Sequence, residues 1–177
     1  HVLYNPQTGQ LFDQCHYRPQ NKRLSGIAFE TISAHSYSVT NKNKIAQAES
    51  DLVFIKLKKR SHQPRLKLAQ DVSNVVSEFS LISSDIEGFK LTRCNKIDHP
   101  HLNSEKLVLH NCPAREGSSG SPILDSPSGD IIAVHGGRFI VQTAENGKEN
   151  TEWIGQARRI DLIMLNIFHR LTTQKPH

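Results

Sequence analysis

Most of the chain is a succession of short apolar or alternating runs separated by polar breaks. The runs lie at residues 10–15, 24–32, 37–39, 52–57, 75–82, 89–94, 107–110, 123–124 and 131–134. Many short strands with turn residues between them predict an all-β protein, either a barrel or a sandwich. The segment 125–130, Asp-Ser-Pro-Ser-Gly-Asp, has the composition of a hairpin connection.

The end of the chain follows a different period. From Arg159 onward the apolar positions recur at helical spacing, at Ile160, Ile163, Leu165, Ile167, Phe168 and Leu171. This period predicts one amphipathic helix over residues 159–173. We expect its apolar face to pack on the β structure.

Composition and charge narrow the classes of partner. The chain has 177 residues, enough for one compact domain, with 22 Lys and Arg against 17 Asp and Glu. The positive charges are scattered apart from residues 56–60, and no aromatic residues alternate with that cluster as base stacking requires. No apolar run approaches the length of a membrane span. We therefore expect no nucleic-acid partner and no membrane span.

The candidate chemistry lies in the turn at residues 115–122, Arg-Glu-Gly-Ser-Ser-Gly-Ser-Pro, between two apolar runs. Glycine neighbours allow a positive φ and a close approach of main-chain N–H groups to a ligand. Such a turn can expose the Ser119 hydroxyl and aim two amides at one point, as an oxyanion hole does. The alternative is a Ser/Gly surface loop without chemistry.

Residues 117–122, Gly-Ser-Ser-Gly-Ser-Pro, resemble the nucleophile signature of trypsin-like serine proteases with the chymotrypsin fold. Ser-Gly-Ser-Pro is similar to the bacterial glutamyl-endopeptidase branch. Residues 50–57 resemble the strand that begins with the triad aspartate, here Asp51, and residues 1–3, His-Val-Leu, resemble the end of the family's histidine motif. Residues 131–137 resemble a wall of the specificity pocket. The resemblance covers nearly the whole chain, in the family order of His, Asp and Ser.

The resemblance implies a fold of two antiparallel β-barrels followed by a C-terminal helix. Residues 1–70 would be the remainder of a first barrel that is incomplete at its N-terminus. Residues 71–158 would be the second barrel and 159–173 the helix, all within one peptidase domain. The family implies a protein or peptide substrate and no cofactor. A secreted or periplasmic location is favoured.

The implied catalytic residues are Ser119 as nucleophile, His1 as general base and Asp51 as the carboxylate that orients the base. The N–H groups of Gly117 and Ser119 would form the oxyanion hole. His35 is a second candidate for the base, because residues 31–35 imitate the family's histidine motif. Only 16 residues separate His35 from Asp51, which is too few for the strands that lie between these two residues in the family. We therefore favour His1, and expect the strands that normally precede it to lie upstream.

Four residues would bind the substrate side chain: His135, Ala114, Gly136 and Gly137. His135 matches the histidine with which glutamyl endopeptidases hold an acidic side chain, and a protonated histidine near a carboxylate is physically reasonable. Gly136 stands where the family commonly has Trp, and Ala114 replaces a residue with a hydroxyl group. These departures leave a preference for Glu or Asp open.

Residues 94–112 contain Cys94, His99, His101, His110 and Cys112, all of which are metal-ligand types. Their spacing matches no common zinc pattern. If 89–97 and 105–112 formed a hairpin, Cys94 and Cys112 would face each other and could form a disulfide. Two reduced thiols are equally consistent with the sequence, and Cys15 would stay unpaired.

Two function classes follow. The first is a serine endopeptidase that acts through an acyl-enzyme. The second is a catalytically inactive protein-binding module with the protease fold, because the assignment of the histidine is the weakest of the three.

Overall fold

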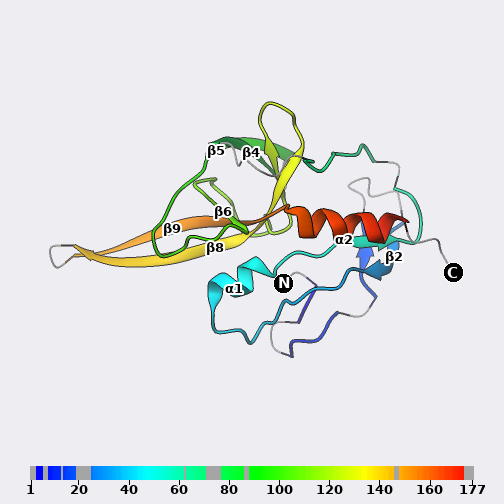
Figure 1. Cartoon of the computed structure of the whole chain (residues 1–177), viewed down its shortest axis with the longest axis horizontal. Coiled ribbons are helices and arrows are strands. Elements are labelled where there is room, and N and C mark those ends of the chain that lie inside the picture. The colour runs from blue at the N-terminus through cyan, green and yellow to red at the C-terminus, as the bar shows by residue number, and fades with distance from the viewer. Residues whose placement is uncertain are drawn as a thin grey trace.

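The computed structural model describes residues 3–5, 8–12, 14–18, 25–61, 63–70, 77–85, 88–145 and 148–173. This part of the chain is mostly β structure, in two antiparallel sheets, and ends in an α-helix (Figure 1). The expectation of a β-rich chain with a C-terminal helix is confirmed.

The first sheet has the order β1-β2-β3 and is built from short strands: β1 (His16–Tyr17), β2 (Ile27–Ile32) and β3 (Ile55–Leu57). Between β2 and β3 the chain forms a short helix, α1 (Lys44–Glu49), which the sequence analysis missed. The Asn43 side chain caps α1 by accepting hydrogen bonds from the N–H groups of Ile45 and Ala46.

The second sheet has the order β5-β4-β7-β8-β9-β6. Its strands are β4 (Glu78–Asp85), β5 (Gly88–Asn95), β6 (Leu107–His110), β7 (Pro122–Asp125), β8 (Ile131–Glu145) and β9 (Lys148–Arg159). The hairpin of β8 and β9 continues well beyond the other strands and projects from the body of the protein (Figure 1). The hairpin connection predicted at 125–130 joins β7 to β8.

The two outer strands of this sheet, β5 and β6, approach each other at one end. A single bridge pairs Lys96 with His110, and the N–H of Ile97 donates to the carbonyl of Leu109 at 2.9 Å. A disulfide joins Cys94, in β5, to Cys112, just after β6. The two segments that the sequence analysis paired, 89–97 and 105–112, therefore meet only at residues 95–97 and 109–111, in the expected register with Cys94 opposite Cys112, and the rest of that hairpin does not form. Instead β5 pairs along its whole length with β4, and β6 pairs with β9.

The hydrophobic core belongs almost entirely to the second sheet. Its buried cluster consists of Phe79, Leu81, Cys94, Val108, Cys112, Ile123, Ala133 and Ala157. Strand alternation sends Phe79 and Leu81 of β4 to this interior. Among the described residues before 77, the buried ones are Ser33, Ala48 and Ala69.

The C-terminal helix, α2 (Leu162–Thr173), begins later than the predicted residue 159, because Arg159 still pairs with Ala133 in β9. Asp161 separates strand from helix, since its Oδ1 accepts a hydrogen bond from the N–H of Met164 at 2.8 Å. In Figure 1, α2 runs from the second sheet toward β2. Its Phe168 ring lies 5.4 Å from that of Phe54, which precedes β3.

The strand predicted at 37–39 is also wrong. Residues 33–38 lie outside any helix or strand, and the Gln47 side chain of α1 donates to the carbonyls of Ser38 and Val39. Two apolar residues, Tyr37 and Val39, are too few to establish the period of a strand. In the described part of the chain, no helix is long and apolar enough to cross a membrane.

Candidate functional site

The Gly-rich turn between β6 and β7 has a conformation that its glycines make possible. Gly117 and Gly120 both have a φ of 89°. The N–H of Ser118 donates to the carbonyl of Arg115 at 3.1 Å, and the buried Ser118 hydroxyl accepts from the N–H of Arg115 at 3.2 Å. These bonds turn Ser118 inward and leave Ser119 half-exposed.

The turn is attached to β8 by two main-chain hydrogen bonds. The N–H of Gly120 donates to the carbonyl of His135, and the N–H of His135 donates to the carbonyl of Ser121, both at 2.8 Å. The Ser119 hydroxyl donates to the carbonyl of Gly136 at 3.0 Å. Within the described residues, the N–H groups of Gly117 and Ser119 have no hydrogen-bond partner. Both donors that the sequence analysis assigned to an oxyanion hole are therefore available to a ligand.

Beside the turn lies a cavity of about 420 Å³, which we call the side-chain pocket. Most of the predicted substrate-binding residues line it. The lining residues are Asn111, Cys112, Pro113, Ala114, Arg115, Glu116, Gly117, Ser119, His135, Gly137, Arg138, Trp153 and Gly155. Gly136, the remaining residue of the predicted set, lines a different cavity. A side chain added at Gly136 would meet the amide of Gln156 at 2.6 Å, so a tryptophan would need Gln156 to move.

A larger cavity of about 900 Å³, which we call the cleft, lies where the two sheets meet. Asp51 from the first half of the chain lines it together with Gly120, His135 and Gly136 of the second. His135 lines both cavities, so Asp51 and Ser119 lie on adjoining cavities. Burial of the Asp51 carboxyl raises its pKa.

Asp51 is positioned by the end of α1, where its N–H donates to the carbonyl of Ala48 at 3.2 Å. The buried guanidinium of Arg158, in β9, attaches this helix end to the second sheet. Its Nε donates to the carbonyl of Glu49, and its Nη2 forms a 2.7 Å ion pair with Asp161. Burial raises the pKa of Asp161, but the Met164 N–H and the Arg158 guanidinium outweigh it and leave that pKa below its usual value. Lys106 and Ser104 also contact the Glu49 carboxylate, at 3.6 and 2.6 Å, so Arg158 is one of several contacts that connect the aspartate loop to the second sheet.

His1, the residue expected to be the base, lies outside the described residues. His35, the second candidate, is exposed, forms a hydrogen bond with the Tyr4 hydroxyl and lines neither cavity. Among the described lining residues of the two cavities, His135 is the one histidine.

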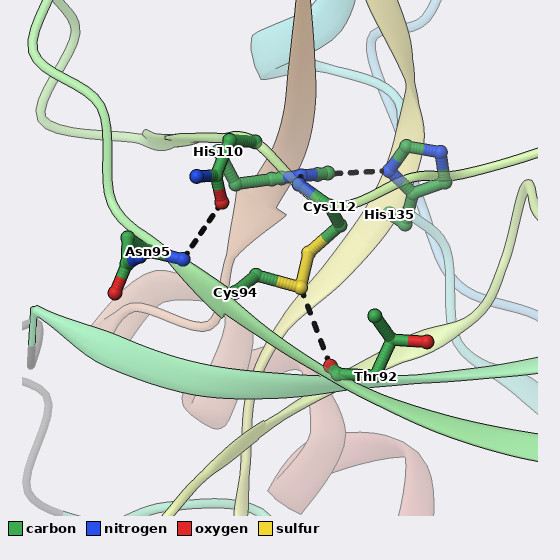
Figure 2. Close-up of a disulfide and its surroundings, with 7 residues drawn as sticks. Thr92, Cys94, Asn95, His110, Cys112 and His135 are labelled. Carbon is green, nitrogen blue, oxygen red and sulfur yellow. Dashed lines mark hydrogen bonds between the residues drawn. A yellow bond between two sulfur atoms is a disulfide. The ribbon is translucent and has the colours of Figure 1, made fainter.

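A buried histidine pair lies behind the side-chain pocket, where the sequence analysis predicted His135 alone. His110 and His135 are 0% and 4% exposed, and His110 Nε2 lies 3.0 Å from His135 Nδ1 (Figure 2). Burial and the neighbouring His135 lower the pKa of His110 to about 3. Burial also lowers the pKa of His135, although a hydrogen bond with the backbone of Gln156 acts in the opposite direction. Both rings are therefore neutral at pH 7.

The hydrogen bonds assign the protons of this pair. The N–H of Cys112 donates to His110 Nδ1 at 3.2 Å, so that nitrogen is an acceptor and the ring proton is on Nε2. His110 Nε2–H must then donate to His135 Nδ1, which leaves the proton of His135 on its own Nε2. The missed residue, His110, carried no local signal, since its partner is 25 residues away in the sequence.

The position of His110 depends on a glycine and on the disulfide. A Cβ at Gly155 would lie 2.2 Å from His110 Cε1, so only glycine leaves room for the ring. The Cys94–Cys112 disulfide lies next to His110 (Figure 2). Of the alternatives that the sequence left open, the structure contains the disulfide. Among the described residues, no three His, Cys, Asp or Glu side chains are grouped to hold a metal ion, and Cys15 is a free thiol.

Comparison with known proteins does not assign this site. A scan against protein-family models finds no match to the chain, and a search of curated proteins finds none either. The functional argument therefore depends on the residue geometry described above.

Proposed function

We propose that this chain is a serine endopeptidase in which Ser119 is the nucleophile. The observation that carries the proposal is the surroundings of Ser119. Its hydroxyl lies on the wall of a pocket, beside two main-chain N–H donors that are free within the described residues. A half-exposed serine with unoccupied donors next to a pocket is the arrangement that acyl transfer needs.

In the proposed reaction, a substrate side chain enters the side-chain pocket and the scissile carbonyl lies against Ser119. The general base, which we assign to His1, removes the proton as Oγ attacks. The N–H groups of Gly117 and Ser119 then stabilise the negative charge on the carbonyl oxygen, an effect worth about 3–4 kcal/mol for one such donor. Loss of the amine leaves an acyl-enzyme, which water hydrolyses.

Asp51 is the proposed orienting carboxylate. It lines the cleft with His135 and Gly136, and the Ser119 hydroxyl donates to the carbonyl of that same Gly136. A carboxylate here can hold the imidazole tautomer and stabilise the imidazolium that forms during attack. The proposed triad therefore takes His1 and Asp51 from the first half of the chain and Ser119 from the second.

We also propose that the second sheet is a β-barrel of the chymotrypsin type. Its six strands are antiparallel and its outer strands, β5 and β6, meet at the Lys96–His110 bridge and at the disulfide. The three-stranded first sheet would then be the remainder of the first barrel, and a secreted or periplasmic setting would suit the disulfide.

A fluorophosphonate probe tests the proposal, because it labels only a serine with an active base. We expect labelling of the purified protein, no labelling of Ser119→Ala, and normal labelling of Ser126→Ala, which changes a serine of the exposed β7–β8 turn. Peptide hydrolysis should likewise be present in the wild type and in Ser126→Ala and absent in Ser119→Ala. A well-folded protein that neither reacts with the probe nor cleaves peptides would reject the peptidase and favour the binding module.

A further inference from the structure

The side-chain pocket contains a guanidinium that forms no ion pair with any carboxylate in the described part of the chain. Arg138, in β8, lies with its Cζ 3.9 Å from the centre of the Trp153 ring, in β9, and both residues line the pocket. In the described part of the chain, Arg138 has no ion pair or hydrogen-bond partner. Stacking on an indole fixes the plane of a guanidinium and leaves its N–H groups free at the edges, where a carboxylate binds.

The geometry of the hairpin explains this stacking. Arg138 pairs with Gly155, so Trp153 is its diagonal neighbour on the same face of β8 and β9. Gly155 has no side chain to come between them. Trp153 is 51% exposed, and Ile140, directly opposite, is 57% exposed, so the stack stands at the open side of the pocket.

The charges around the pocket favour an anion. The charged side chains that line it are Arg115, Glu116 and Arg138, which sum to 2 − 1 = +1. His135 adds no charge, because its Nδ1 faces His110 and its pKa is lowered by burial. The fixed positive charge of the pocket therefore comes from its two arginines, of which Arg138 is the one held by an aromatic ring.

We propose that Arg138, held on Trp153, is the residue that selects an acidic substrate side chain, and that the neutral His135 is not. This inference rests on the proposed peptidase function, in which the side-chain pocket receives the substrate. The acidic side chain binds at the mouth of the pocket, where its carboxylate accepts two parallel N–H bonds from Arg138. The role that the sequence resemblance implied for His135 is thereby assigned to a different residue.

The test compares two peptides that differ only by Glu or Gln at the cleavage position. For the wild-type protein we expect kcat/KM to favour the Glu peptide by about tenfold, the value of one charge-assisted hydrogen bond. Arg138→Gln should bring the ratio close to one. Arg138→Lys should keep part of the preference, since it retains the charge without the planar stack. Arg93→Gln, which removes the same charge from an exposed position on β5, should leave the ratio unchanged.

The pH profile separates the arginine from the histidine. The charged and titratable groups that face Arg138 across the pocket are Arg115 and Glu116 of the turn and His135 of β8. Because a guanidinium stays charged at all accessible pH, the Glu/Gln ratio should be constant from about pH 6 to about pH 9. A ratio that falls as the pH rises through the histidine range, or that survives in Arg138→Gln, would overturn the proposal.

A binding measurement makes the result independent of catalysis. Fluorescein-labelled Glu and Gln peptides are titrated against Ser119→Ala and against Ser119→Ala combined with Arg138→Gln. Tighter binding of the Glu peptide that disappears with Arg138 supports the inference, even if the fluorophosphonate experiment rejects the peptidase. If the wild-type protein reacts with the probe but Ser119→Ala binds the Glu and Gln peptides equally, the inference about Arg138 is rejected and the peptidase proposal is not.

Discussion

The two sheets differ in how they are held together. The six-stranded sheet has its own buried core and a disulfide, whereas the three-stranded sheet and α1 contribute few buried side chains. The serine turn, both proposed oxyanion donors and the side-chain pocket belong to the first of these regions. The second supplies Asp51. One half of the proposed site is thus built into a rigid sheet, while the other is positioned through a few contacts such as those of Arg158.

The largest expected effect comes from the weaker region. Asp51→Asn should lower kcat by about 10⁴-fold, because the base loses the group that holds its tautomer. Peptide hydrolysis and the rate of fluorophosphonate labelling measure this loss. Asp98→Asn, at a side chain that is 81% exposed, is the matched control and should have no effect. A loss of less than about tenfold for Asp51→Asn would remove this residue from the mechanism.

A pair of phenylalanines measures the difference in packing. Phe79 in β4 is fully buried, so Phe79→Ala should lower the free energy of unfolding by about 4 kcal/mol. Phe29 in β2 is half-buried, and the same change there should cost about 1 kcal/mol. Denaturant unfolding of the two variants gives the comparison. Equal losses would show that the two regions are equally well packed.

The disulfide should contribute about 3 kcal/mol to the stability of the six-stranded sheet, because it closes a loop between cysteines 18 residues apart. The double variant Cys94→Ser, Cys112→Ser should unfold at correspondingly lower denaturant concentration, as should the wild type in dithiothreitol. Cys15→Ser, which removes the free thiol, is the control. If reduction left the stability unchanged, the disulfide would play no part in holding β5 to β6.

Arg158→Lys tests the connection between the two regions. Lysine keeps the charge but cannot reproduce the fork that reaches Glu49, Lys106 and Asp161, so about 2 kcal/mol of stability should be lost at about 1 kcal/mol for each missing hydrogen bond. Turnover should fall as well, since α1 then holds Asp51 less well. Loss of stability with full activity would show that α1 is positioned by other contacts.

The smallest effect, taken per pH unit, is a pH dependence that arises in the six-stranded sheet. His110 has a pKa of about 3 when folded, against an ordinary value of 6.5, so below pH 6.5 the unfolded chain binds the additional proton. The free energy of unfolding should therefore decrease as the pH is lowered from 6.5 to about 3, by about 1.4 kcal/mol for each pH unit. Asp161 adds to this loss only at the acid end, since its pKa is depressed below 3.8.

The control for this prediction is the exposed histidine of α2. His110→Gln should reduce the slope and leave the part that comes from the lowered pKa of His135, whereas His169→Gln should keep the whole slope. A slope that is the same in wild type and in His110→Gln would mean that other groups bind the proton.

The sequence alone determined the β-rich character of the chain, the C-terminal helix and the serine turn, because each depends on local chemistry. The spacing of apolar residues, the turn residues and the steric freedom of Gly117 and Gly120 each depend on a few neighbouring positions in the chain. The role of Asp51 came instead from the resemblance of residues 50–57 to a protease strand, and it stays a prediction. The start of α2 was misplaced, because the pairing of Arg159 with Ala133 involves a partner distant in the sequence.

Only the tertiary structure decided what surrounds these residues. The contacts of His110 with His135, of Arg138 with Trp153 and of Arg158 with Glu49 join positions that are far apart in the chain. None of them leaves a periodic signal, since each depends on strand order and register. Whether His135 is charged was therefore beyond sequence reasoning, because the pKa of an imidazole depends on what it is buried against.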